Sequence, residues 1–137
     1  MEKHRELSDA AFLQQFANCQ LPPSLFSHEA HLRFAWLHLE QYELEEAIQR
    51  VADQIMNYVT ALGAVDKFNM TLTVAAVRAV HHFRQRSETT RFLDFIGAFP
   101  QLKNNFKGLL ASHYTTDIYQ SPLAKTTYLE PDLLPFS

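Results

Sequence analysis

Cysteine, glycine and long apolar runs are scarce in this 137-residue chain, and each scarcity excludes a class of structure. Cys19 is the only cysteine, so no intramolecular disulfide forms and no cysteine-based zinc site can be built. No run approaches the roughly 18 apolar residues of a membrane-spanning helix, and the N-terminal stretch MEKHRELSDAAF lacks the apolar core of a secretion signal. We therefore expect a cytoplasmic protein that is neither exported nor membrane-bound.

Positive charge is scarce as well, whereas apolar side chains are abundant. The net charge of -3 argues against binding to phosphate backbones, so no nucleic-acid partner is expected. With 47% hydrophobic residues and 11 phenylalanines, the chain can bury a core without metals or disulfides. Its length predicts a single domain over residues 1–137.

Apolar residues recur with a helical period, and alternating Val/Ile/Thr runs typical of strands are missing. We predict an all-α fold, a compact single-domain bundle of about five to six helices with an extended C-terminal tail. After a short first helix, the expected helices cover residues 28–42, 43–62, 67–86, 90–99 and 102–113. Residues 1–7 are expected to be flexible, and residues 115–137 to form a tail that packs on the bundle.

Residues with known preferences for helix ends mark several of these boundaries. Ser8, Ser27, Asp66 and Ser121 are suited to be N-caps, because their side-chain oxygens can accept from free backbone amides. Gly63 suits the position just after a helix, where the backbone often becomes left-handed.

The predicted second helix carries two early histidines. On a helical wheel His28 lies on the inward stripe and His31 at its margin, whereas Glu29 and Arg33 fall on the wetter side. At His28, in the first helical turn, the helix dipole disfavours an imidazolium, and burial acts in the same direction. A neutral imidazole can accept a hydrogen bond or bind a metal. The alternative is that both histidines are structural and donate to backbone carbonyls in the core.

Further polar residues lie near helix ends later in the chain. Asn69 and Thr73 share the line of the fourth helix's apolar stripe, whereas Thr71 falls on the opposite, solvated face. Asn69 can alternatively cap a helix that starts late. His113 and Tyr114 close the sixth helix, where a histidine can also simply complement the negative helix end.

We expect the inward polar residues to converge on one cavity at one end of the bundle. The predicted ligand-binding residues are His28, His31, Asn69, Thr73, His113 and Tyr114. Such a cavity could bind a small polar ligand, with a neutral histidine as proton acceptor. A divalent metal is permitted, with His28, His31 and His113 as candidate ligands, but the chain lacks metalloprotease and di-iron spacings.

Three separated motifs support a resemblance. FSHEAHLRFAWLHL, KFNMTLT and HYTTDIYQSPLAKTTYLEPDLLPF occur in this order, and together they resemble a family of small uncharacterised all-helical bacterial proteins. The resemblance covers most of the chain and implies no established activity. The family's middle motif usually reads Tyr-His-Glu-Thr where this chain has Phe68, Asn69, Met70 and Thr71. The resemblance therefore implies that Asn69 weakens any metal site here.

Two classes of function stay open. The first is a small-molecule-binding protein or enzyme that uses a histidine-lined pocket, and it predicts a concave, partly wet cavity. The second is a helical interaction module or homodimer with structural histidines, in which an exposed apolar patch around Phe34 and Leu37 meets a partner. Another helix of the same chain could equally cover Phe34 and Leu37.

Overall fold

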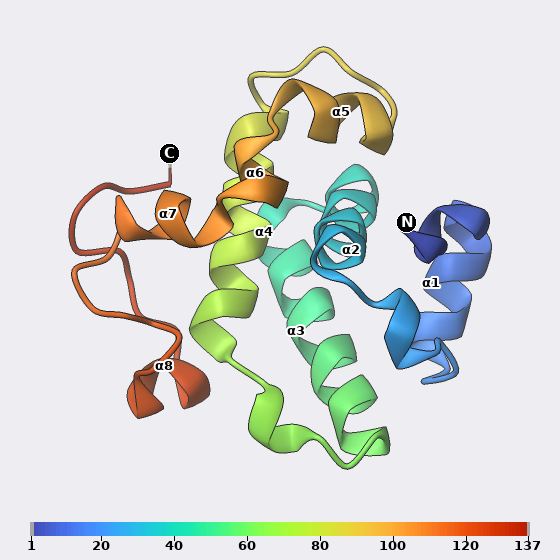
Figure 1. Cartoon of the computed structure of the whole chain (residues 1–137), viewed down its shortest axis with the longest axis horizontal. Coiled ribbons are helices and arrows are strands. Elements are labelled where there is room, and N and C mark those ends of the chain that lie inside the picture. The colour runs from blue at the N-terminus through green and yellow to red at the C-terminus, as the bar shows by residue number, and fades with distance from the viewer. Residues whose placement is uncertain (1, 137) are drawn as a thin grey trace. The chain divides into compact units, whose positions relative to one another are not determined.

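The structure, a computed structural model, describes residues 2–136 (Figure 1). Across these residues the chain forms eight α-helices, three short 3-10 helices and no strand, so the predicted all-α fold is confirmed. Contacts divide the chain into two compact units, Met1–Phe68 and Asn69–Ser137, and the expectation of a single domain stays a prediction. No helix within residues 2–136 has both the length and the apolar character needed to cross a bilayer.

The first unit is built from three main helices (Figure 1). They are α1 (Asp9–Ala17), α2 (His28–Gln41) and α3 (Leu44–Ala61). Short 3-10 helices occupy Lys3–Glu6, Pro23–Leu25 and Val65–Lys67. Both α1 and α2 pack against α3.

Local sequence signals set the ends of these helices as expected. The Oγ of Ser8 accepts from the amide of Ala11 at 3.1 Å, and the Oγ of Ser27 accepts from that of Ala30 at 3.2 Å. After α3 the backbone of Gly63 takes a φ of 69°, a left-handed conformation that glycine adopts at little cost.

Aromatic rings form the core of the first unit. Phe12, Phe16 and Phe34 are fully buried, and the ring centroid of Phe16 lies 4.2 Å from that of Phe34 and 4.5 Å from that of Tyr58. Leu37 is buried as well. The alternative of an exposed apolar patch around Phe34 and Leu37 is therefore wrong, because the aromatic rings of the same unit cover Phe34.

The second unit combines one long helix with four shorter ones. They are α4 (Met70–Arg84), α5 (Phe92–Ala98), α6 (Gln101–Asn104), α7 (Phe106–Ala111) and α8 (Pro122–Thr126). α8 packs against α4, and α6 packs against α7. Ser121 caps α8 through the amide of Ala124 at 3.2 Å, and from Thr127 to residue 136 the chain is non-helical. The tail after α8 is therefore non-helical, with bends at residues 127 and 132–134.

The start of α4 differs from the sequence-based expectation. The helix begins at Met70, and Asn69 is its N-cap, with Oδ1 accepting from the amide of Leu72 at 2.9 Å. Asp66 lies instead within the 3-10 helix before it. The alternative in which Asn69 caps a helix that starts late is thus confirmed.

The helix expected over residues 102–113 is interrupted. Asn105 takes φ and ψ of -146° and 45°, outside the helical region, so α6 ends before it and α7 begins after it. Asparagine is a weak helix former because its side chain competes for backbone hydrogen bonds, which fits a break at this position.

Candidate functional site

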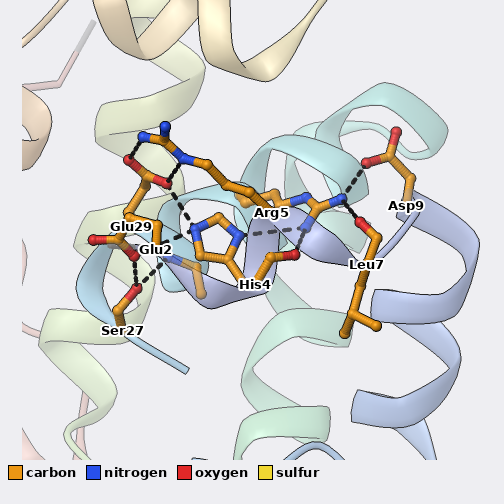
Figure 2. A network of polar contacts seen from close by, with 9 residues as sticks. Glu2, His4, Arg5, Leu7, Asp9, Ser27 and Glu29 are labelled. Atoms are coloured by element: carbon orange, nitrogen blue, oxygen red, sulfur yellow. Dashed lines mark hydrogen bonds and ion pairs between the residues drawn. The ribbon is translucent and has the colours of Figure 1, made fainter. Parts of the chain in front are cut away.

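A charged network fixes the segment before α1 onto α2 (Figure 2). The carboxylate of Glu29 has no exposed side-chain surface, and Arg5 binds both of its oxygens, with Nε donating to Oε2 at 2.8 Å and Nη2 to Oε1 at 2.6 Å. His4 is fully buried, and its Nε2 lies 2.7 Å from Oε2 of Glu29. Glu29, which we expected on the wetter side of the helix, is therefore buried, whereas the flexibility expected of residues 1–7 stays a prediction.

Arg33 of α2 completes this network from the other side of His4. Its Nη1 donates to the backbone oxygen of His4 at 2.7 Å, and its Nη2 donates to the oxygen of Leu7 and to Oδ1 of Asp9, both at 2.8 Å. Arg33 is also buried, so its expected solvated position is wrong. The reason is that residues 4–9 fold back over this face of α2, which helical periodicity alone cannot reveal.

The contacts of His4 define where its ring proton lies. A guanidinium has only donors, so the Nδ1 of His4, 3.3 Å from Nη1 of Arg33, must be an acceptor. The proton is therefore on Nε2, which donates to Glu29. Desolvation by burial lowers the pKa of His4 and outweighs the raising effect of Glu29, which keeps the imidazole neutral.

The same tautomer argues against a metal in this network. Among residues 2–136, one group of potential ligands gathers closely: Glu2, His4 and Glu29 place ligand atoms within 4.8 Å of one another. A cation at Nε2 of His4 would require a proton on Nδ1, but this nitrogen faces Arg33, whereas metal-bound histidines donate to carbonyls, carboxylates or water. The donor set does not fit a divalent cation, and the network is an anchor for the N-terminal segment.

The two predicted histidines of α2 differ in their surroundings. His28 is exposed, so its expected inward position is wrong. It is the first residue of the helix, and because side chains lean toward the N-terminus, its ring extends past the packed part of α2. His31 is half-buried and its ring packs on Phe26, with the centroids 5.0 Å apart.

His31 is neutral, as predicted, but lacks the expected structural partner. Desolvation, with a smaller contribution from His28, lowers the pKa of His31 from its ordinary value to about 4. Its Nε2 is sealed from solvent and has no hydrogen-bond partner among residues 2–136. Buried polar atoms are nearly always paired, so the nitrogen of His31 is an unusual feature of α2.

In the second unit, Asn69 and Thr71 are occupied by structural hydrogen bonds. Besides capping α4, Asn69 donates from Nδ2 to the backbone oxygen of Ile118 at 2.9 Å. Thr71 is fully buried, so our expectation of a solvated face is wrong. Its Oγ1 donates to the oxygen of Thr127 at 2.8 Å and accepts from the amide of Leu129 at 3.0 Å. α4 therefore holds the start of the C-terminal tail.

The predicted residues at the end of α7 also bind the tail. The hydroxyl of Tyr114 donates to the oxygen of Leu129 at 2.8 Å. The Nδ1 of His113 donates to the oxygen of Leu134 at 2.6 Å, and its ring stacks on Phe136 with the centroids 4.2 Å apart. Tyr114 thus binds the backbone of the tail, and His113 binds both its backbone and the ring of Phe136.

The predicted site residues therefore fall into two sets. Four of them belong to the second unit: Asn69, Thr73, His113 and Tyr114. Thr73 is buried as expected. His28 and His31 belong to the first unit, and the convergence of the two sets on one cavity, with or without a metal, stays a prediction.

A half-open hollow of about 230 Å³ in the first unit, here called the His38 pocket, is lined by residues outside the predicted site, of which Gln14, Ala17 and Gln41 are exposed. Its polar lining residues are Gln14 of α1, His38 and Gln41 of α2, Tyr42, and Gln54 of α3. Leu13 and Ala17 of α1 supply its apolar wall.

His38 gives this pocket a defined acceptor. The side chain is 5% exposed, and its Nδ1 lies 2.9 Å from the oxygen of Phe34, which fixes the ring proton on Nδ1. The lone pair of Nε2 then lies at Gln54, whose amide nitrogen is 3.3 Å away. Burial lowers the pKa of His38, so the imidazole is neutral and Nε2 can accept a hydrogen bond.

Part of the His38 pocket had a signal in the sequence. His38, Gln41 and Tyr42 are spaced three and four residues apart, which places them on one side at the end of the predicted second helix. Nothing in the spacing, however, indicates that α1 brings Gln14 or that α3 brings Gln54 to the same place.

A second hollow, of about 260 Å³, lies in the second unit along residues 107–119. Tyr114 lines it, but its hydroxyl is already bonded to Leu129. The ammonium of Lys107 lies 5.3 Å from the ring centroid of Tyr119 and is exposed. The buried polar group of this hollow is thus held by a short bond, whereas the Nε2 of His38 has the longer contact with Gln54, at 3.3 Å.

No family model matches the chain, and searches of curated proteins and of solved structures found no match either. The resemblance to a family of small bacterial proteins therefore stays a prediction, and the functional argument depends on the geometry of the sites.

Proposed function

We propose that this protein binds a small uncharged polar molecule in the His38 pocket. The supporting observation is the buried, neutral imidazole of His38, which lines the hollow together with Gln54, the partner of its acceptor nitrogen. Its contact with Gln54, at 3.3 Å, is longer than the usual range of such hydrogen bonds. A ligand donor would satisfy this nitrogen better than Gln54 does.

The size and charge of the His38 pocket restrict the ligand. At about 230 Å³ it is smaller than the roughly 300 to 1,000 Å³ of pockets for drug-sized molecules. Among the described residues, none that lines it is acidic or basic apart from the neutral His38. A small molecule without net charge fits this lining, because a charged one would be desolvated without a counter-charge.

The lining favours binding over catalysis. His38 bonds to a backbone carbonyl through Nδ1, and no carboxylate orients it as in known nucleophile and base pairs. The other polar groups are carboxamides and a phenol, which hold ligands through hydrogen bonds. The interaction-module alternative, in turn, loses its proposed surface because Phe34 and Leu37 are buried.

The proposal can be tested by screening small polar fragments against the ¹⁵N-labelled full chain with NMR. We expect at least one uncharged fragment to shift the side-chain amide signals of Gln54 and Gln41. Gln49, on the exposed face of α3, donates to Asp53 and gives the internal control, since its signal should stay unchanged. If no fragment shifts the pocket signals at millimolar concentration, the proposed function is wrong.

A further inference from the structure

We infer that the ligand of the His38 pocket is a planar cyclic amide, such as a free pyrimidine base. This inference rests on the proposed function, since it names the chemical class that the same pocket would select. It follows from the kinds of donor and acceptor that three helices bring to the cavity wall.

Carboxamides dominate the polar wall of the pocket. Gln14, Gln41 and Gln54 come from α1, α2 and α3; the first two are exposed and the third is half-buried, and each carboxamide has an acceptor oxygen beside a donor nitrogen. A ligand edge with a carbonyl next to an N–H pairs with such a group through two hydrogen bonds at once. Glutamine reads the edges of nucleic-acid bases in this way, and a cyclic amide offers the same edge.

His38 adds a requirement for a donor on the ligand. Its Nε2 has a lone pair and no proton, because the ring proton is bonded to Phe34. A ring N–H can take the place of the long Gln54 contact, at 3.3 Å, on this lone pair, whereas a ligand that carries only carbonyl or ether oxygens has no donor for it. Sites built around such a bond discriminate strongly against ligands that lack the donor.

The remaining walls suit an uncharged ring. Leu13 and Ala17 offer apolar surface on the side of α1. The guanidinium of Arg50 lies 4.2 Å from the ring centroid of Tyr42 and donates to Glu46, but Arg50 does not line the pocket itself. With no Lys or Arg among the described residues that line it and only about 230 Å³ of space, the pocket suits a base rather than a phosphorylated nucleotide.

Three related probes separate these requirements: uracil, 1,3-dimethyluracil and orotate. They share one ring, but dimethyluracil lacks both N–H donors and orotate adds a carboxylate. We expect uracil to shift the side-chain amide signals of Gln54 and Gln41 in NMR titrations of the full chain. Dimethyluracil and orotate should each have an affinity at least about tenfold lower than that of uracil. Equal affinity of uracil and dimethyluracil would overturn the inference.

A pair of substitutions on α3 links binding to the pocket. Gln54→Ala should weaken uracil binding roughly tenfold, because one double hydrogen bond is lost. Gln49→Ala, the same change on the exposed face, should leave the affinity unchanged. Because Gln54 is only half-buried, its variant should fold, and the unfolding midpoint checks this. Equal uracil affinity in both variants would overturn the inference.

The same experiments separate the inference from the proposed function. If other uncharged fragments shift the signals of Gln54 but uracil does not, the cyclic-amide assignment is wrong and the small-molecule pocket stands. If neither uracil nor any fragment shifts them, both are wrong.

Discussion

The segment before α1 and the segment after α8 both lie outside the α-helices, yet different kinds of interaction hold them in place. Residues 2–9 are fixed by charges, with the buried carboxylate of Glu29 between Arg5 and His4. The tail from Thr127 is fixed by neutral side chains, such as those of Thr71 and Tyr114, that bond to its backbone.

The difference lies in what each anchor depends on. A buried charge without its partner is strongly destabilising, so each member of the N-terminal network is needed. A neutral hydrogen bond contributes about 0.5 to 1.5 kcal/mol, and the tail spreads its attachment over several of them. Single substitutions should therefore weaken the N-terminal anchor strongly. In the tail, each lost hydrogen bond should remove only a part of the attachment.

Breaking the charged anchor should have the largest effect. Arg5→Met would remove the guanidinium that binds both oxygens of the buried Glu29 carboxylate in the network of Figure 2. We expect a loss of about 3 kcal/mol in the free energy of unfolding, at the low end for broken buried pairs because the Arg5 side chain is 45% exposed and water can replace part of it. Urea unfolding measures this loss.

The matched control is the exposed pair of Arg50 and Glu46 on α3, whose atoms are as close, at 2.8 Å. Arg50→Met should lower the stability far less than Arg5→Met, because exposed ion pairs contribute little. Equal losses in the two variants would mean that burial does not set the strength of the N-terminal anchor.

Acid should also weaken the first unit through His31. The folded pKa of about 4 lies below the ordinary value of 6.5, so between pH 6.5 and 4 the unfolded chain binds a proton that the folded chain does not. Stability is therefore fully present above pH 6.5 and falls as the pH drops toward 4. Between pH 7 and pH 5 we expect this group to remove about 2 kcal/mol, given about 1.4 kcal/mol per pKa unit.

The substitution His31→Phe removes this titration while keeping a ring against Phe26. Urea unfolding at pH 7 and at pH 5 should show a smaller acid loss in this variant than in the wild type. His28→Phe, at the exposed neighbouring histidine, should behave like the wild type. An unchanged acid loss in His31→Phe would show that His31 is protonated in the folded protein without cost.

The neutral anchor should give the smallest loss. Thr71→Val keeps the shape of the side chain but removes the bonds to Thr127 and Leu129. We expect the stability to fall by about 1 to 2 kcal/mol, with the amide of Leu129 exchanging faster with solvent. Thr126→Val, at an exposed position of α8, should leave both unchanged. Unchanged exchange at Leu129 in Thr71→Val would show that other bonds hold the tail.

Much of the fold follows from local chemistry. The period of the apolar residues predicts an all-α chain, and Ser8, Ser27 and Ser121 cap helices where expected, because capping involves residues three apart. The neutral state of His31 was also predictable, since its place at the margin of the apolar stripe implies burial, which lowers the pKa of an imidazole. The corrected start of α4 follows the same local rule, applied to Asn69 instead of Asp66.

The tertiary structure decided what covers each helix face. Periodicity assigned Glu29, Arg33 and Thr71 to wet surfaces, but the chain ends fold back over them and supply their partners. Likewise the His38 pocket needs Gln14 and Gln54 from helices far apart in sequence. A sequence determines the pattern of each helix, whereas burial depends on which distant segment packs against it, and no local spacing encodes that choice.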